Sequence, residues 1–196
     1  VVEMEDRMVP RMMNDTAGGL IKAWCEEQGV HVHTATKVTA IEKNGGRFSV
    51  TLNTGSTITA DLIVSATGVR PNVDLLAGTG VETDDGILVN RNMQTNDPNI
   101  FAAGDVAQGR DFSTGKYSVQ AIQPTAAEHA QLAARNMAGI VGAVHRGSVN
   151  MNVLDTLGLI SSSFGLWMGA KDGQTSELLN RSRYRYLNLQ FTDDVL

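Results

Sequence analysis

The chain has 196 residues, of which 42% are hydrophobic and 19% charged, so it can build a core in one or two domains. The formal net charge of −5 argues against nucleic acid as a partner, because that affinity depends largely on Lys and Arg that neutralise phosphates. No apolar run approaches the roughly 20 residues of a membrane span, and no signal peptide opens the sequence. We therefore expect a cytoplasmic protein that does not contact a membrane.

The first predicted elements are an apolar strand and an amphipathic helix. Residues 1–2 indicate the strand. Apolar residues at helical spacing predict a helix over residues 15–28, with Asn14 or Asp15 as its cap. The single cysteine, Cys25, falls on the apolar face of this helix and cannot form an internal disulfide. Because reactive thiols need exposure and cationic neighbours, we interpret Cys25 as a buried structural thiol.

Runs of alternating polarity next predict a small antiparallel sheet. After a short strand at residues 30–34, alternating segments at residues 37–43, 47–52 and 56–59 are separated by glycine-containing turn signals. Residues 62–66 are continuously apolar, which is typical of a parallel strand buried on both faces. We therefore expect a meander followed by one strand of a parallel sheet.

The second half of the chain begins with α/β character and ends with β character. The α/β part is predicted to contain a short helical piece at 73–77, strands at 87–90 and 100–103, and a helix at 125–137 that Pro124 begins. The β part is predicted to contain strands at 149–154, 159–167 and 184–191, with a polar loop at 171–183. The change of character after Gly142 places a domain boundary near residue 145.

The end of the strand predicted at residues 100–103 is the first candidate binding position. Gly104 and Asp105 follow it, so a carboxylate stands at the first position free of the strand. In open α/β sheets ligands collect just beyond the carboxyl ends of such strands. A carboxylate fixed there can hold a sugar-like diol through charge-assisted hydrogen bonds, which are about twice as strong as neutral ones. The alternative is that Asp105 only caps the next helix or turn.

Two motifs, in this order and spacing, carry a resemblance to a known family. The first is Ala66-Thr67-Gly68-Val69-Arg70-Pro71-Asn72, and the second, about thirty residues on, is Ile100-Phe101-Ala102-Ala103-Gly104-Asp105. The pair resembles the pyridine nucleotide-disulfide oxidoreductase superfamily. These flavoproteins include NADH oxidases, rubredoxin and ferredoxin reductases, and the flavin half of nitrite reductase, and the C-terminal segment looks closer to the nitrite and rubredoxin reductases than to the disulfide reductases.

The resemblance implies an α/β fold with parts of two doubly wound, Rossmann-like dinucleotide-binding domains and the beginning of an α+β interface domain. It assigns residues 1–70 to the later part of an NAD(P)H-binding domain and residues 71–144 to the returning segment of an FAD-binding domain. Residues 145–196 would begin the C-terminal interface domain.

The resemblance also implies which residues contact FAD. Asp105 would accept hydrogen bonds from hydroxyls of the ribityl chain of the flavin, and Gly104 would be small because the cofactor passes against it. The helix start at Gln123, Pro124, Thr125 and Ala126 would direct its free N–H groups and positive dipole end at the flavin ring. A plain helix N-terminus without a ligand is the alternative.

For the nicotinamide cofactor, the resemblance implies roles for Glu3 and Gly68. An acidic residue directly after a strand of a dinucleotide-binding fold bonds the adenosine ribose of NAD and repels the additional phosphate of NADP, so we favour NADH over NADPH. The alternative for Glu3 is an exposed side chain with no role. Gly68 would bring the backbone close to the nicotinamide cofactor.

The activity implied by the resemblance is hydride transfer from NAD(P)H to FAD, with electrons passed to an unidentified acceptor. A small redox protein is a candidate acceptor, and the C-terminal domain is a candidate homodimer interface; no catalytic residue is assigned. Neither G-x-G-x-x-G fingerprint occurs in the chain, so we expect a fragment, truncated at both ends, that is inactive alone and binds FAD weakly or not at all. The alternative is a cofactor-free interaction module or an inert fragment.

Two weaker signals are interpreted structurally. His31 and His33 could share a metal, but no third ligand is evident, so we expect no metal site. In residues 181–186 three Arg alternate with Tyr, which we interpret as a strand with Tyr toward the core and Arg in solvent rather than as a nucleic-acid surface.

Overall fold

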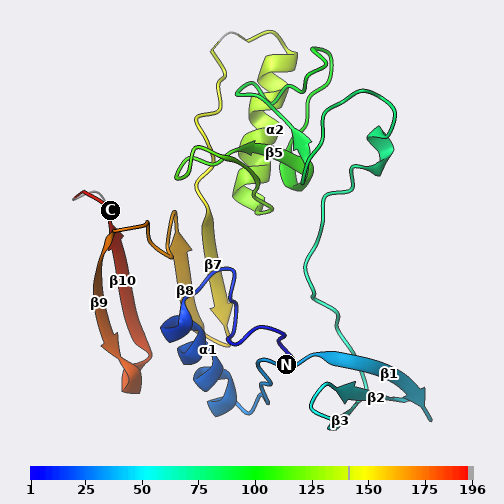
Figure 1. The fold of residues 1–196 in the computed structure, drawn as a ribbon, viewed down its shortest axis with the longest axis vertical. Coiled ribbons are helices and arrows are strands. Elements are labelled where there is room, and N and C mark those ends of the chain that lie inside the picture. The colour runs from blue at the N-terminus through cyan, green and yellow to red at the C-terminus, as the bar shows by residue number, and fades with distance from the viewer. Residues whose placement is uncertain (141, 194–196) are drawn as a thin grey trace. The chain divides into compact units, whose positions relative to one another are not determined.

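The computed structural model describes residues 1–140 and 142–193 and forms two compact units (Figure 1). The first unit comprises Val1–Thr67, Val153–Ser163 and Trp167–Leu196, and the second comprises Gly68–Asn152 and Phe164–Leu166. The mixed α/β composition expected from the sequence is confirmed. The assignment of these parts to NAD(P)H-binding, FAD-binding and interface domains stays a prediction.

Helix α1 (Asp15–Glu27) carries a small core in the first unit. Of its two candidate caps the structure uses Asn14, whose side-chain oxygen accepts a hydrogen bond from the N–H of Ala17 at 3.0 Å. The core around the helix comprises the buried side chains of Met13, Ile21, Cys25 and Val32. The predicted helix and the buried position of Cys25 are therefore confirmed.

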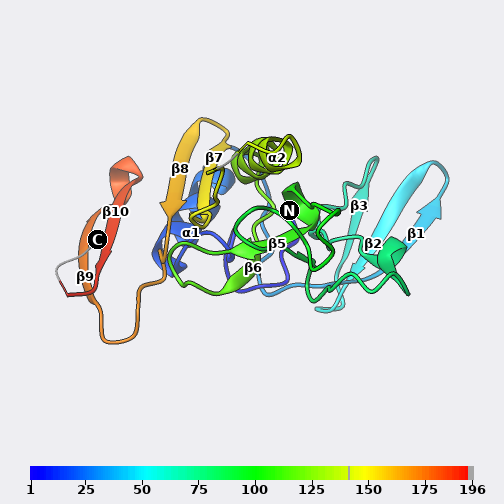
Figure 2. The same ribbon diagram turned by 90° about the horizontal axis from the view of Figure 1, so that it is seen from above.

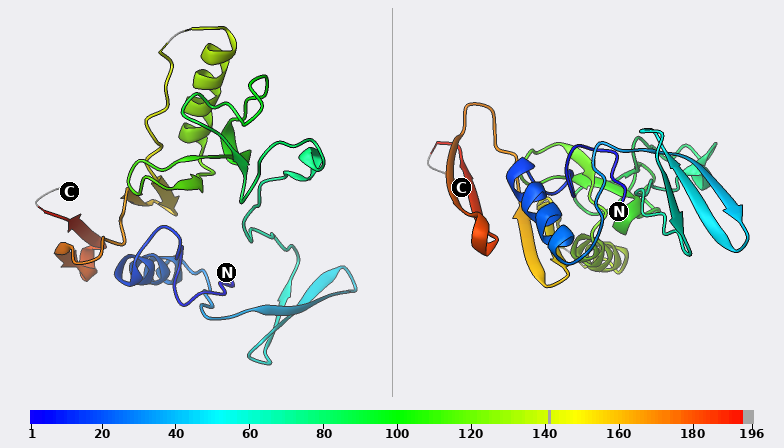
Figure 3. Two further views of the ribbon diagram at one scale, coloured as in Figure 1. Left: turned by 45° about the horizontal axis from the view of Figure 1, so that its top comes forward. Right: turned by 90° about the horizontal axis from the view of Figure 1, so that it is seen from below.

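The predicted meander is confirmed as a three-stranded antiparallel sheet of β1 (Val38–Asn44), β2 (Arg47–Leu52) and β3 (Thr57–Ala60), in that order (Figure 3). Val50 of the central strand lies opposite Ile41 on one side and Ile58 on the other. Cross-strand apolar pairs of this kind are the main stabilising contacts of a sheet. Every residue of β1 is exposed, so the sheet buries little of its edge strand.

The expected strand at residues 62–66 does not form. These residues are in an irregular, extended segment, and Leu62 and Val64 are 75% and 78% exposed. The strands expected at residues 1–2 and 30–34 are likewise reduced to one parallel bridge between Val2 and His33. A parallel strand exists only where neighbours supply its hydrogen bonds, and the described residues supply none to residues 62–66.

The second unit is built on a sheet of three short strands, in the order β4 (Ile87–Leu88), β5 (Ala107–Arg110) and β6 (Tyr117–Val119). β4 and β5 are parallel, whereas β5 and β6 are antiparallel. The core comprises the buried side chains of Ile87, Val89, Met93, Ala102, Ala107 and Ala133. The 3-10 turn η1 (Asp74–Leu76) confirms the short helical piece expected there.

The strand expected at residues 100–103 does not form, so that prediction is wrong. Phe101 makes only one antiparallel bridge, to Gln94, although Ala102 is buried as expected. A 3-10 turn, η2 (Gly104–Val106), follows. Pairing is limited to this bridge and to two backbone hydrogen bonds, in which the N–H of Thr95 donates to the carbonyl of Ile100 and the N–H of Ala102 donates to that of Met93. This contact is too short to form a strand.

Helix α2 (Gln123–Met137) confirms the predicted helix, with Pro124 in its first turn. The buried residues of α2 are Thr125, His129 and Ala133, one every fourth position. They form a narrow stripe toward the rest of the second unit, between positions with small exposed side chains such as Ala130 and Ala134. No helix among the described residues combines the length and the apolar character that crossing a membrane requires.

The C-terminal part forms two hairpin-like pairs, β7 (Met151–Thr156) with β8 (Leu159–Phe164) and β9 (Gln174–Asn180) with β10 (Arg185–Phe191) (Figure 2). β9 lies within the predicted polar loop at 171–183, so that prediction is wrong. All seven residues of β9 are exposed, so its sequence carries no burial periodicity and its strand conformation comes from pairing with β10. The predicted strand at residues 184–191 is confirmed from Arg185 onward.

Aromatic contacts attach the β9–β10 hairpin to α1 within the first unit. The rings of Trp24 and Tyr184 meet edge to face with centroids 5.2 Å apart, and the hydroxyl of Tyr184 donates to the carboxylate of Glu27. The hydroxyl of Tyr186 accepts a hydrogen bond from the side-chain amide of Asn14 at 2.7 Å. Both tyrosines therefore face the rest of the unit, as expected. The strand expected over residues 181–186 is wrong for its first part, because Arg181–Arg183 form the 3-10 turn η3 and Tyr184 ends it in a left-handed conformation.

Candidate functional site

The turn η2 (Gly104–Val106) presents the carboxylate that the sequence singled out. Ala103 is extended, with φ −146° and ψ 156°, and Gly104 then adopts φ +80°. A side chain at that φ is strained, so the direction of the turn depends on glycine. Asp105 is exposed, and none of the described residues makes a hydrogen bond or ion pair with its carboxylate.

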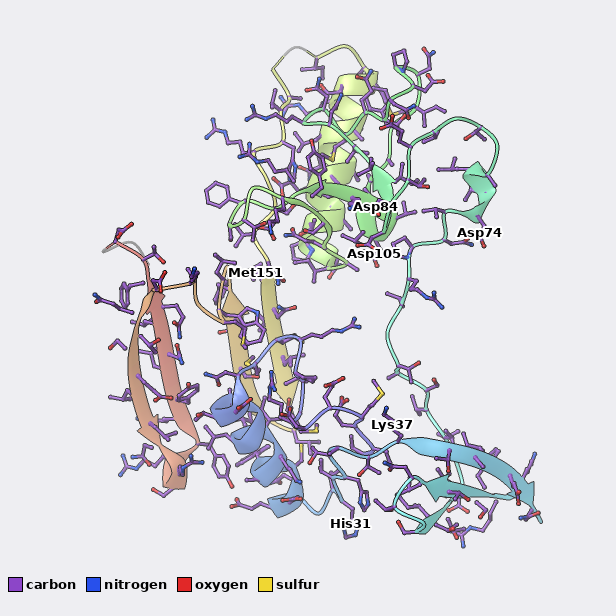
Figure 4. The ribbon with its side chains drawn as sticks, in the orientation of Figure 1. His31, Lys37, Asp74, Asp84, Asp105 and Met151 are labelled. Carbon is purple, nitrogen blue, oxygen red and sulfur yellow. The ribbon has the colours of Figure 1, made fainter. Side chains whose placement is uncertain are left out.

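The turn packs against the beginning of α2. A Cβ placed on Gly104 would lie 3.6 Å from Cβ of Ala126, which is ordinary van der Waals contact between two small residues. Figure 4 shows Asp105 at the same end of the second unit as the first turn of α2. An exposed carboxylate and a helix N-terminus therefore lie side by side.

The beginning of α2 has no side-chain cap. Its N-cap residue is Ile122, which has no polar group to offer, and Pro124 has no N–H. The backbone N–H groups of Gln123 and Thr125, at the positive end of the helix dipole, are thus available to an acceptor. Asp105 caps neither α2 nor its own turn, whose N-cap is Ala103. Asp105 therefore does not have the capping role that was its alternative interpretation.

A hollow of about 280 Å³ opens beside this helix start. Its walls are Ile122, Pro124, Thr125, Glu128, Gly147, Val149 and Met151. A larger hollow of about 450 Å³ lies around η1 and includes none of the predicted site residues. Of the predicted site residues, Pro124 and Thr125 line the smaller hollow, whereas the other predicted flavin-site residues line neither hollow.

The residues predicted for the nicotinamide cofactor are in different units. Glu3, in the first unit, is half-buried, and its Oε1 accepts a hydrogen bond from the N–H of Glu5 at 2.9 Å. That contact leaves the other carboxylate oxygen for a ligand. Gly68, at the beginning of the second unit, is exposed and has φ +93°. Glu3 and Gly68 are therefore described separately, each within its own unit, and not as one nicotinamide site.

Three buried polar side chains near α2 were not singled out in the sequence. His129, His145 and Ser148 are 2%, 1% and 3% exposed and are hydrogen-bonded together. A signal for His129 existed, since it follows Thr125 and precedes Ala133 at helical spacing. No sequence signal connects it with the other two, which lie in an irregular segment. Among the described residues no group of three or more His, Cys, Asp or Glu side chains is arranged to hold a metal ion, and both His31 and His33 are exposed.

The fold and this turn define a mixed α/β protein with a glycine-dependent, acidic turn beside a helix start. Comparison with known proteins identifies its family. Residues 1–136 match the family described as pyridine nucleotide-disulphide oxidoreductase. The chain belongs to this family, so the resemblance inferred from the sequence motifs is confirmed. Its members are FAD-dependent reductases that use NADH or NADPH.

Relatives and solved structures match nearly the whole chain. The NADH-dependent phenylglyoxylate dehydrogenase subunit epsilon of Aromatoleum evansii is 33% identical over 195 residues, which is 99% of this chain and 46% of that protein. An FAD-dependent pyridine nucleotide-disulphide oxidoreductase from Desulfovibrio vulgaris has a TM-score of 0.86 and 27% identity over 97% of this chain and 49% of that one. A ferredoxin reductase from Rhodopseudomonas palustris has a TM-score of 0.85 and 25% identity over 98% and 47%. The chain spans about half the length of these proteins.

Proposed function

We propose that the chain forms part of an FAD-dependent NAD(P)H oxidoreductase in which hydride passes from NAD(P)H to FAD and electrons continue to a further acceptor. The observation that carries the proposal is the acidic turn at Asp105 against the uncapped start of α2, in a chain of this family. FAD, when bound, supplies the hydride and electron chemistry, and the protein supplies position and electrostatics.

On the flavin side, Asp105 is proposed to accept hydrogen bonds from ribityl hydroxyls. Its exposed carboxylate has acceptor positions that no described residue fills, and a polyol is a matching donor. Gly104 is proposed to allow close approach of the cofactor, because it carries no side chain at the end of the strand-like segment. These residues fit the cofactor that the family uses.

The first turn of α2, residues 123–126, is proposed to face the flavin ring. The N–H groups of Gln123 and Thr125 would point at it, and the helix dipole would stabilise negative charge there. Pro124 holds this turn in helical conformation before any ligand binds, because its φ is fixed. Ala126 is small enough to let η2 approach.

On the nicotinamide side, Glu3 is proposed to bond the adenosine ribose and Gly68 to let the backbone approach the cofactor. The half-buried carboxylate of Glu3 is already oriented by the N–H of Glu5. An acid at this place disfavours the additional phosphate of NADPH, so NADH is the proposed reductant. The relative from Aromatoleum evansii is named as NADH-dependent, which supports this choice.

The remaining proposals concern domains, partners and setting. Residues 1–70, 71–144 and 145–196 are proposed to belong to the NAD(P)H-binding, FAD-binding and interface domains. A small redox protein is the proposed acceptor, since one solved structure similar to the chain is named as a ferredoxin reductase. Homodimer formation through the C-terminal domain and a cytoplasmic setting are further proposals, as is the inactivity of the chain by itself.

The test of the flavin site is the substitution Asp105→Asn in the full-length protein. Loss of the charged acceptor should cost about 1.5 to 3 kcal/mol, equivalent to roughly ten- to a hundredfold weaker FAD binding in a titration of the apoprotein. The matched control is Asp74→Asn, which changes another exposed aspartate in a 3-10 turn and should leave the FAD affinity as it was.

Equal FAD affinity of the two variants would remove Asp105 from the flavin site. A full-length protein that takes up no flavin at all would favour the second candidate, a cofactor-free interaction module. Circular dichroism of both variants distinguishes loss of binding from loss of folding.

A further inference from the structure

A buried cluster of two histidines and one serine lies behind the first turns of α2. Nε2 of His129 is 3.2 Å from Oγ of Ser148, and Nε2 of His145 is 3.0 Å from the same oxygen. The two imidazole rings meet edge to face, with centroids 4.9 Å apart. All three side chains are almost completely buried, so water does not compete for these hydrogen bonds.

The hydrogen bonds of the cluster require at least one neutral histidine, and the surroundings of His129 disfavour its charged form. A serine hydroxyl has one hydrogen, so it donates to one imidazole and accepts from the other. Nδ1 of His129 is buried with no hydrogen-bond partner. Protonation of His129 would place a charged N–H at that atom without an acceptor, which is a costly arrangement in a protein interior. Protonation of both rings would add repulsion between two cations at 4.9 Å.

The same cluster connects four segments of the second unit. The N–H of Ser148 donates to the carbonyl of Arg110 in β5, and the N–H of Phe112 donates to the carbonyl of Ser148. The N–H of His145 donates to the carbonyl of Arg91. The ring of His129 lies 3.7 Å from where a Cβ on Gly109 would stand, so β5 packs directly on it. The histidines therefore hold α2 to the sheet and to residues 145–148.

Five charged residues lie on the segments that surround the cluster: Glu128, Arg91, Arg110, Asp111 and Arg146. Glu128, half-exposed on α2, has a carboxylate oxygen 3.9 Å from Nε2 of His145 and favours its protonation. Arg91 opposes it. Asp111 is bound by the side-chain amide of Gln120, which also donates to the carbonyl of Ser148, and Arg110 and Arg146 are exposed.

We propose that His129, His145 and Ser148 form an acid-sensitive clasp, which holds α2 against β5 when neutral and releases the helix when it takes up protons. The inference rests on contacts within the second unit and does not depend on the proposed function. If that function is correct, the clasp also fixes the helix turn that would face the flavin, because His129 lies one turn after Thr125.

The direction of the pH dependence follows from the two histidines. Burial, with a smaller contribution from His145, lowers the pKa of His129 from 6.5 to about 4. Burial also lowers the pKa of His145, although Glu128 opposes the shift. The unfolded state therefore binds more protons than the folded state below pH 6.5, so the stabilisation is complete above pH 6.5 and is lost as the pH falls toward 4.

Nuclear magnetic resonance of the chain with ¹⁵N-labelled histidine tests the clasp directly. The chain has four histidines, of which His31 and His33 are exposed and serve as internal references. We expect both cluster histidines to stay neutral down to the pH at which α2 loses protection from amide exchange. Titration of His129 at its ordinary value of 6.5 in the folded chain would overturn the proposal.

Amide exchange measured by mass spectrometry, corrected for intrinsic rates, provides the second readout. Between pH 7.5 and 5 the protection of α2 should fall roughly tenfold or more, while that of α1 changes little. The variant His129→Gln, which cannot take up the proton, should have a protection of α2 that varies much less with pH, and His31→Gln should behave as the unsubstituted chain. A protection of α2 that is independent of pH in the unsubstituted chain would also overturn the proposal, even if His129→Gln does not fold.

Discussion

Met93 contributes both core packing and a backbone hydrogen bond to the second unit. Its side chain is completely buried in the core beside Ile87 and Ala102, and its backbone has φ +60°, which is unusual for a residue other than glycine. The carbonyl of Met93 also accepts the N–H of Ala102 at 3.0 Å. Packing and hydrogen bonding together therefore hold this residue in an unfavourable conformation.

At this scale we predict that Met93→Ala lowers the free energy of unfolding by about 2 to 5 kcal/mol, because the substitution leaves a cavity in the core. Urea unfolding followed by circular dichroism measures the change. Met137→Ala is the matched control, since Met137 is 68% exposed and its substitution should change stability by less than about 0.5 kcal/mol. Equal effects of the two substitutions would show that Met93 is not part of the core.

Some polar residues of the second unit could be predicted from the sequence and others could not. Asp105 could be recognised because glycine and a carboxylate follow an apolar run, a local pattern. His145 and Ser148 could not, because their meaning depends on His129, which is 16 and 19 residues away in sequence and joins them only through packing.

At the scale of elements, two adjacent glycines of α1 occupy opposite environments. A Cβ on Gly18 would lie 2.8 Å from the carbonyl oxygen of Met8 and 3.0 Å from Cβ of Arg7, so the loop before the helix packs directly on it. A Cβ on Gly19 would meet nothing within 4 Å. Gly18 is thus required for packing, whereas Gly19 only weakens the helix.

We therefore predict opposite effects of two neighbouring substitutions. Gly19→Ala should raise the free energy of unfolding by about 0.5 to 1 kcal/mol, through helix propensity. Gly18→Ala should lower it by about 1 to 3 kcal/mol, because the backbone of the loop must move. Thermal unfolding measured by circular dichroism compares the two variants, and stabilisation by Gly18→Ala would contradict the packing described for the loop.

Elements defined by local signals were predicted well, and elements defined by pairing were not. Helix α1 has its periodicity and its cap within one stretch of sequence, α2 has its periodicity and Pro124, and the meander has its turns. β9 has exposed residues throughout and is a strand only because β10 pairs with it. Residues 62–66 have the composition of a buried strand but no partner among the described residues.

At the scale of the whole molecule, the segment between the meander and η1 exposes several large apolar side chains. Leu62, Val64 and Val69 are 75%, 78% and 76% exposed, and residues 62–70 lie in no helix or strand. Unpaired and exposed backbone is the preferred substrate of proteases. Each unit has its own core, so cleavage here need not unfold either one.

We predict that thermolysin at low concentration cleaves the chain within residues 62–70 before it cleaves α1 or α2. Mass spectrometry of the first products locates the cuts, which should fall before Leu62, Val64 or Val69 because thermolysin prefers large apolar residues. Leu132, which packs against the core of the second unit, is the reference site and should be cut late. First cuts within the helices would mean that residues 62–70 are protected by contacts that the structure does not contain.

The sequence by itself determined the family, the two helices with their ends, the meander, the buried cysteine and the acidic turn after Gly104, because each depends on residues close together in the chain. Tertiary structure decided which apolar runs became strands, and it brought His129, His145 and Ser148 together around one hydroxyl. The reason is physical: helix periodicity and capping are satisfied within a segment, whereas a strand needs hydrogen bonds from a neighbour and a buried polar group needs a partner that only the folded chain supplies.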